Sequence, residues 1–407
     1  MSITLEAIKF NHDPNSASTD ALNIRKNGAQ FINVPEWQRG ISVNPQDSLI
    51  AYALYETQGH KITIQARFKR SSAKIQTAQV RAVDPLVNPP KPRGCLEFLL
   101  WLLRLILRAL FGNVLGEVKG RTVTFLPSDE TAFESFELKN VRLWNAGIGI
   151  RTTTWQWQYR LNAGDPWIDI ETSRHQVYSV LATPKLPWQQ APYNAANTQL
   201  PWTEVLDYAC RWAFLKGNLD EAAARVTRSV YELGPSVIEY DCPGGGGTHY
   251  SWGSFNCTAF LDRLKGGPGN GQYVNCTDCA TIVSTFANIL GCDLWQSRMQ
   301  SNFDLNPILA IGSGAWHPGC PGWLSPGFSY HEVAWKGACT SNENVFDGCL
   351  QVDGDADPTT APHSPLLPTD MRFGLPGDGD YRDRLATPAG QPNCEPAPST
   401  RQRRMLI

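Results

Sequence analysis

The chain has 407 residues with 36 basic and 38 acidic side chains, so its formal net charge of −2 provides no overall field to attract nucleic acid or an anionic membrane. Hydrophobic residues make up 42% of the chain and 14 residues are Trp, which excludes collagen, a coiled coil and simple disorder. At this length two domains are expected, and 34 Gly with 29 Pro imply many turns and a substantial β content.

The first part of the chain, residues 1–185, alternates polar and apolar residues in short runs separated by Asn, Pro and Gly. Such alternation is typical of strands with one buried face. These runs predict a mainly antiparallel β-sandwich domain, and the tryptophans of its WQWQYR and DPWIDI segments are expected in the core. The clearest runs are residues 61–68, 73–80, 121–125, 136–143, 153–159 and 175–181.

An apolar segment interrupts this domain at about residues 94–117. Its only charges over residues 95–116 are Glu97, Arg104 and Arg108, which fall within about 40° of one another on a helix. A membrane span usually needs about 20 apolar residues with few charges, whereas the charge-free stretch between Glu97 and Arg104 has six. We therefore expect a helical insertion that docks on a membrane surface or a protein partner, or one that packs in a groove of this chain or of an oligomer.

A Pro-rich linker at residues 186–192 leads into a second domain over residues 193–357, which begins with predicted helices at 201–213 and 219–233. Its two glycine-dense loops are residues 242–250 and 266–271. They lack the Gly-Lys-Ser/Thr ending of a phosphate-binding loop and the strand-turn-helix context of a dinucleotide site. No nucleotide or organic cofactor is expected. Residues 358–407 carry nine prolines and are predicted to be an irregular C-terminal tail.

The N-terminus lacks a basic stretch followed by an apolar one, so no cleaved secretory signal is predicted and a cytoplasmic location is expected, with export by another route left open. An odd count of 11 Cys favours a reducing compartment over a dense disulfide framework. No metal is expected: Cys276 and Cys279 form a C-x-x-C without a second ligand pair, and the acidic run at 353–358 has Pro where a calcium loop needs Gly.

The segment that follows Cys276 carries the chemical signal. Its apolar residues share one helix face, and Gly291 is a natural stop, so Cys276 is predicted at a helix N-terminus. There the helix dipole and the free N–H groups stabilise a thiolate and can form an oxyanion hole. The apolar face comprises Ile282, Val283, Phe286, Ile289 and Leu290.

A nucleophilic Cys needs a base, and the base needs a group that orients it. Residues 330–335 alternate as a strand that carries His331, and residues 344–352 are predicted to be the next strand. If residues 336–343 close a hairpin, Asp347 lies beside His331 and can hold the imidazole tautomer. The sequence therefore predicts Cys276, His331 and Asp347 as a catalytic triad.

These residues resemble the transglutaminase-like superfamily, in which the nucleophile is followed by x-Asp-x-Ala and by an apolar helix ending in Leu-Gly, here Cys276-Thr-Asp278-Cys-Ala280 with Gly291. The Asp347 that follows His331 by sixteen residues is similar to that superfamily's His and Asp strands. The resemblance covers roughly residues 200–352. It implies a papain-like α+β fold with Cys276, His331 and Asp347 as the active site and Asp278 as a structural residue at the helix end.

The resemblance also implies acyl transfer through a thioester on a protein or peptide substrate, by amide hydrolysis, glutamine deamidation or cross-linking. Two departures from the pattern leave the substrate class open: Asn275 precedes the nucleophile, and the familiar His-x-Trp becomes His331-Glu-Val-Ala-Trp335. Cys279 is expected to be a buried thiol and is the second candidate nucleophile. The alternative function is that of a catalytically silent scaffold that acts through the helix at 95–116. Oligomeric state is left open.

Overall fold

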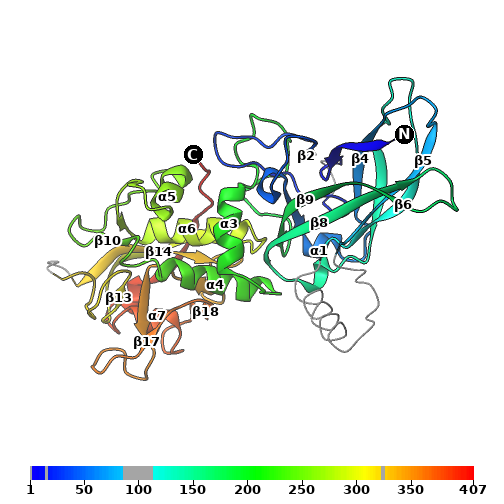
Figure 1. Cartoon of the computed structure of the whole chain (residues 1–407). Helices are drawn as coiled ribbons and strands as arrows, with labels where there is room; N and C mark the ends of the chain where they lie inside the picture. The colour runs from blue at the N-terminus through cyan, green and yellow to red at the C-terminus, as the bar shows by residue number, and fades with distance from the viewer. Residues whose placement is uncertain (1, 14–16, 86–112, 322–325) are drawn as a thin grey trace, which may run out of the picture. The chain divides into compact units, whose positions relative to one another are not determined.

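The structure is a computed structural model that describes residues 2–13, 17–85, 113–321 and 326–407. The chain divides into two compact units. Unit 1 comprises Met1–Ile24 and Phe31–Thr183, and unit 2 comprises Arg25–Gln30 and Pro184–Ile407 (Figure 1). The fold is α+β: unit 1 is built on a large sheet, and unit 2 combines helices with smaller sheets.

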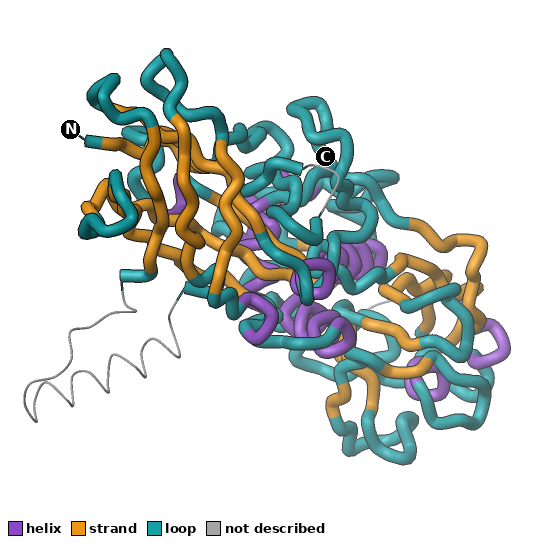
Figure 2. Tube along the Cα trace, turned by 90° about the vertical axis from the view of Figure 1, so that its right-hand side faces the viewer, coloured by secondary structure: helices purple, strands orange, loops and turns teal. Residues whose placement is uncertain are grey.

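Unit 1 is organised around a nine-stranded sheet with the order β2-β1-β4-β7-β6-β5-β8-β9-β3, drawn as neighbouring orange tubes in Figure 2. All neighbours are antiparallel except β3 and β9, which pair in parallel, so the sheet is mainly antiparallel, as the sequence predicted. The strands are β1 (Ile3–Lys9), β2 (Trp37–Gln38), β3 (Leu49–Ala53), β4 (Thr63–Arg70), β5 (Thr77–Val83), β6 (Glu117–Thr124), β7 (Glu134–Lys139), β8 (Gly149–Arg160) and β9 (Ile168–Val180). Helix α1 (Leu54–Thr57) follows β3.

Alternation along several strands gives this sheet a buried face, as in β4, where Ile64, Ala66 and Phe68 are all fully buried. The ring centroids of Phe68 and Trp157 lie 5.6 Å apart although three strands separate β4 from β8 in the sheet order. The sheet therefore curls so that its two halves pack face to face, as in a sandwich whose two sheets are joined through β6 and β7.

The tryptophans of unit 1 divide between core and surface. Trp155 and Trp157 are fully buried, as expected. Trp167 is only half-buried, because it lies on the loop between β8 and β9 rather than on a buried strand face. The guanidinium groups of Arg81 and Arg160 lie 4.1 and 4.6 Å from the centre of its ring. The prediction that it belongs to the core is wrong.

The apolar segment at 95–116 lies outside the described residues except for residues 113–116. Within the described ranges, the structure contains no helix with the length and apolar character needed to cross a membrane.

Unit 2 places a buried helix, α6 (Cys276–Asn288), against helices and a five-stranded antiparallel sheet with the order β18-β15-β14-β12-β19. The helix contacts β14 on one side and α3 and α4 on another (Figure 1). The other helices are α3 (Thr203–Trp212), α4 (Leu219–Tyr231), α5 (Cys257–Leu264) and α7 (Tyr381–Leu385). The sheet contains β12 (Trp295–Asp304), β14 (Gly327–Trp335), β15 (Asn344–Phe346), β18 (Met371–Arg372) and β19 (Glu395–Gln402).

Two small sheets complete unit 2. In one, β10 (Glu239–Tyr240) and β11 (Tyr273–Val274) pair in parallel. In the other, β16 (Leu350–Asp353) lies between β13 (Leu309–Ala310) and β17 (Pro365–Leu366).

Both ends of α6 follow the sequence signals. Asn275 is the N-cap and forms a capping box with Asp278, and Gly291 adopts a φ of +98° just after the helix. Every residue of α6 is buried, although the sequence pattern predicted one apolar face. The polar face is buried because β14 and the neighbouring helices cover the helix on several sides.

The segments predicted as linker and tail are structured. Trp188, within the predicted linker, is buried and donates its indole N–H to the carbonyl of Thr285 in α6 at 2.9 Å. The predicted irregular tail contains β19, which pairs with β12 at the edge of the sheet. An edge strand tolerates Pro396 and Pro398 because one of its sides needs no ladder hydrogen bonds, so proline content was a poor guide here.

Candidate active site

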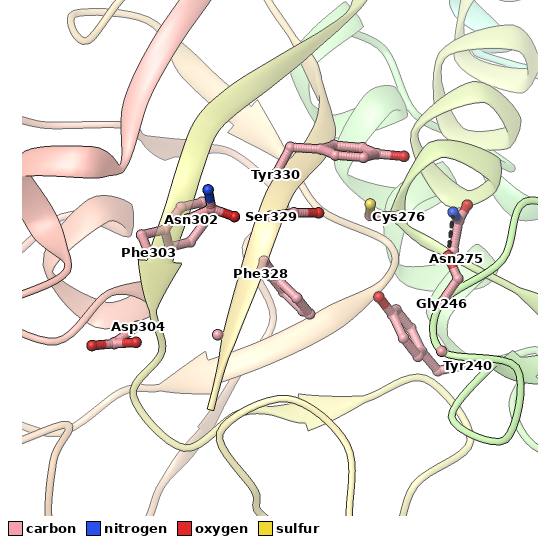
Figure 3. A pocket seen from close by; sticks show the side chains of 12 residues that line it. Tyr240, Gly246, Asn275, Cys276, Asn302, Phe303, Asp304, Phe328, Ser329 and Tyr330 are labelled. Atoms are coloured by element: carbon pink, nitrogen blue, oxygen red, sulfur yellow. Dashed lines mark hydrogen bonds between the residues drawn. The ribbon is translucent and has the colours of Figure 1, made fainter. Parts of the chain in front are cut away.

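Cys276 occupies the first position of α6, directly after the short strand β11. Its side chain is 4% exposed and lines a cavity of about 350 Å³ (Figure 3). The first N–H groups of a helix have no partner within the helix, and those of Cys276 and Thr277 donate to no acceptor in the described part of the chain. The thiol therefore lies beside backbone donors that are available to a bound group.

His331 lies on β14 and is paired with Asp347. Its Nε2 is 2.9 Å from Asp347 Oδ2, and both side chains are buried, at 0% and 1% exposure. The two strands form the predicted hairpin, since β14 ends at Trp335 and β15 begins at Asn344. The structure thus brings His331 and Asp347 together as the sequence predicted.

Asp347 itself does not lie within a strand. The predicted strand over 344–352 is interrupted, because β15 ends at Phe346 and β16 begins at Leu350. The interruption gives the carboxylate further donors: Cys349 N–H donates to Oδ1 at 2.8 Å, and the Tyr381 hydroxyl donates to Oδ2 at 2.7 Å. These contacts fix the carboxylate in position for His331.

The second ring nitrogen of His331, Nδ1, is buried and has no hydrogen-bond partner of good geometry among the described residues. Burial lowers the pKa of His331, but the charge and hydrogen bond of Asp347, followed by the hydrogen bond and charge of Cys276, outweigh it and raise the pKa to about 10. Since Asp347 occupies Nε2, Nδ1 is the nitrogen available to Cys276. The ring of Phe328 stacks on the imidazole at 5.1 Å and restrains its orientation.

The cavity in front of Cys276 combines aromatic walls with polar groups. The hydroxyl ends of Tyr240 and Tyr330 are directed toward the side of the cavity that holds Cys276 (Figure 3). The complete lining is Tyr240, Gly245, Gly246, Asn275, Cys276, Asn302, Phe303, Asp304, Gly327, Phe328, Ser329 and Tyr330. The cavity therefore gives a small polar group access to the Cys276 side chain.

Two aspartates hold the glycine-rich loop at 242–250, and one of them, Asp278, lies in the first turn of α6. Asp278 accepts hydrogen bonds from the N–H groups of His249 and Tyr250, each at 2.9 Å, and from that of Asn275 at 3.2 Å. Asp241 accepts from loop N–H groups and pairs with the half-exposed His249 at 3.0 Å. Asp278 is therefore a structural residue in this geometry. The loop is further tied by a disulfide between Cys242 and Cys320.

A buried ionic network lies behind the site, and no local pattern in the sequence indicated it. Glu332, next to His331, is fully buried and forms ion pairs with Arg404, at 2.6 Å, and with Arg298, at 3.3 Å. Thr277, next to Cys276, donates its hydroxyl to the same carboxylate at 2.8 Å. The network connects the start of α6, strand β14 and the C-terminal segment, which are remote in sequence.

Cys279 is less suited to nucleophilic attack. It is 1% exposed and is absent from the cavity lining. A hydrogen bond with Cys349 lowers the pKa of Cys279, but burial and the charges of Asp278 and Asp347 outweigh this effect and raise it. A high pKa and lack of access both disfavour a reactive thiolate.

The ranges that the structure describes contain no group of three or more His, Cys, Asp or Glu side chains arranged to hold a metal ion.

Neither a protein-family model nor a curated protein sequence matches the chain. Among solved structures, the chain is similar to the crystal structure of red sea bream transglutaminase, with 11% sequence identity and a TM-score of 0.30. The similarity covers 82% of this chain and 50% of the other, so the chain spans about half the length of the structure that it matches.

Proposed function

We propose that the protein is a cysteine-dependent acyl-transfer enzyme in which Cys276 is the nucleophile, His331 the proton carrier and Asp347 the group that orients His331. One observation carries the proposal: a single buried imidazole pairs one nitrogen with a fixed carboxylate and leaves the other for a thiol at a helix N-terminus. This arrangement has the parts that thiol-based acyl transfer requires. The cavity that Cys276 lines provides access for a substrate.

The reaction begins with proton transfer from the Cys276 thiol to Nδ1 of His331, which leaves a thiolate beside an imidazolium. The pKa of His331, raised to about 10, favours the imidazolium at neutral pH, so the pair rests as a thiolate and an imidazolium. The sulfur attacks the carbonyl carbon of an amide, and the carbonyl electron pair moves onto the oxygen. When the tetrahedral intermediate collapses, His331 donates its proton to the departing nitrogen, and a thioester on Cys276 remains.

A second nucleophile then resolves the thioester and restores the thiol. Attack by water gives hydrolysis of a peptide bond or deamidation of a side-chain amide, and attack by an amine gives a new amide bond. We propose a protein or peptide as the acyl donor. All three outcomes use the same three residues and the same intermediate.

Alkylation by iodoacetamide at pH 6 tests the nucleophile, because an ordinary thiol with a pKa of about 8.5 is almost wholly protonated at that pH. Peptide mapping should show fast labelling confined to Cys276, and His331→Ala should slow it. The matched control is His363→Ala, because His363 also pairs with a buried aspartate, Asp353, but is not among the residues of the site. Labelling of Cys276 no faster than that of the other free cysteines, or unaffected by His331→Ala, would contradict the proposal.

A further inference from the structure

The proposed reaction places a negative charge on the carbonyl oxygen, and enzymes of this kind stabilise it with two or more fixed donors. The N–H groups of Cys276 and Thr277, which donate to no acceptor within the described ranges, supply backbone donors. The sequence alone indicated no side-chain donor. The cavity offers one in Tyr240, whose hydroxyl end is directed toward Cys276 (Figure 3).

Tyr240 is positioned by the same short sheet that positions the nucleophile. It lies on β10 and is in register with Val274 of β11, two residues before Cys276. Backbone hydrogen bonds flank this pair, from Tyr240 N–H to the Ile311 carbonyl and from Asp241 N–H to the Val274 carbonyl, both at 2.9 Å. A shift of Tyr240 would therefore require the strand that leads into α6 to move with it.

The ring of Tyr240 is also fixed from the side of the base. It stacks on Phe328 with centroids 6.4 Å apart and planes 22° apart, and Phe328 in turn stacks on His331. Tyr240 is 6% exposed. Preorganisation of this kind is what gives an oxyanion donor its catalytic effect, because no reorganisation is needed at the moment of reaction.

We infer that Tyr240 is a further catalytic residue, which donates its hydroxyl hydrogen to the oxyanion that forms when Cys276 attacks a carbonyl, together with the N–H groups at the start of α6. This inference rests on the proposed acyl transfer. Burial, and then the charge of Cys276, raises the pKa of Tyr240 well above its ordinary value, which keeps the hydroxyl protonated as a donor.

Tyr330 also lines the cavity, and its hydroxyl and its ring both contact neighbouring side chains. Its hydroxyl lies 3.2 Å from the hydroxyl of Thr277, and its ring is covered by the guanidinium of Arg298 at 4.1 Å. Tyr208→Phe removes a phenolic hydroxyl from α3, outside the lining of the cavity, and is therefore the control for Tyr240→Phe.

The test compares two reagents on the full-length protein. Acylation of Cys276 by p-nitrophenyl acetate passes through a tetrahedral oxyanion, and its nitrophenolate leaves without needing a proton. Alkylation by iodoacetamide displaces iodide and forms no oxyanion. Tyr240→Phe should slow acylation by about 10²-fold, the scale of losing one oxyanion donor, and should leave alkylation unchanged. Tyr208→Phe should leave both rates close to those of the wild type.

The possible results distinguish the proposed acyl transfer from the proposed role of Tyr240. Unchanged acylation in Tyr240→Phe, or an equal fall in acylation and alkylation, would overturn the role of Tyr240 while wild-type acylation at Cys276 still supports acyl transfer. A wild type that is neither acylated nor alkylated at Cys276 would overturn the proposed function and this inference with it. Because alkylation also reports on an intact site, its retention in Tyr240→Phe shows that the variant is folded.

Discussion

Asp347→Asn removes the charge that holds His331 while preserving the size of the side chain. The pKa of His331 is raised from an ordinary value of 6.5 to about 10, and a rise of this size favours the protonated ring by about 5 kcal/mol, because one pKa unit is about 1.4 kcal/mol. Asp347 supplies the largest contributions to the rise, and burial opposes them. Without the carboxylate, burial dominates and the ring is expected to be neutral at pH 6.

The consequence falls on Cys276, which loses its cationic neighbour. A thiol with an ordinary pKa of about 8.5 is only about 0.3% ionised at pH 6, so alkylation of Cys276 in Asp347→Asn should slow by about 10- to 300-fold at that pH. The difference should narrow as the pH approaches 9, where an ordinary thiol ionises. The assay is the pH dependence of iodoacetamide labelling, quantified for the peptide that contains Cys276.

The matched control is Asp353→Asn, since Asp353 is equally buried and pairs with His363 at 2.6 Å. It should leave the labelling of Cys276 unchanged. Thermal unfolding of both variants checks that the fold persists, because the amide that replaces each carboxylate keeps one oxygen as an acceptor. Labelling of Cys276 at pH 6 at the wild-type rate in Asp347→Asn would refute the assignment of Asp347 as the residue that maintains the protonated ring.

Two predictions concern stability. Burial lowers the pKa of His175 to about 3, so the neutral ring's contribution to folding stability is fully present above pH 6.5 and is lost as the pH falls from 6.5 toward 3. The free energy of unfolding, measured in urea, should drop by up to about 1.4 kcal/mol per pH unit over this range. His175→Gln should flatten that slope. A pH dependence of the unfolding free energy that is the same in His175→Gln as in the wild type would contradict this role of His175. Arg404→Met leaves the buried carboxylate of Glu332 with Arg298 as its remaining cation and should cost about 3 kcal/mol in the same assay, whereas the exposed Arg401→Met should cost about 1 kcal/mol or less. Equal losses of unfolding free energy in Arg404→Met and Arg401→Met would show that the buried ion pair of Arg404 and Glu332 adds nothing to stability.

Much of the local structure follows from the sequence. The alternating runs became β4 to β9 with boundaries that differ by up to seven residues, and the helices predicted at 201–213 and 219–233 correspond to α3 and α4. Asn275 and Gly291 bound α6 as the pattern indicated. These signals succeed because caps, turns and strand alternation depend on residues only a few positions apart.

The pairing of His331 with Asp347 was also predictable, since a hairpin between them is a local connection. The break in the strand at Asp347 was not predictable from the local sequence. It depends on Pro368 and Tyr381, which bond Asp347 from distant segments. The hairpin indicated which residues meet, and the surrounding packing determined how the carboxylate is held.

By itself, the sequence determined the helix that presents Cys276 and the His-Asp hairpin. Only the tertiary structure decided that the polar face of α6 is buried, that the proline-rich C-terminal segment supplies an edge strand, and that Tyr240 lines the same cavity as the nucleophile. The physical reason is that burial and long-range pairing depend on which surfaces meet in space. Arg404 and Glu332 illustrate this, since they are 72 residues apart in the chain, and neither has a sequence neighbour that indicates its partner.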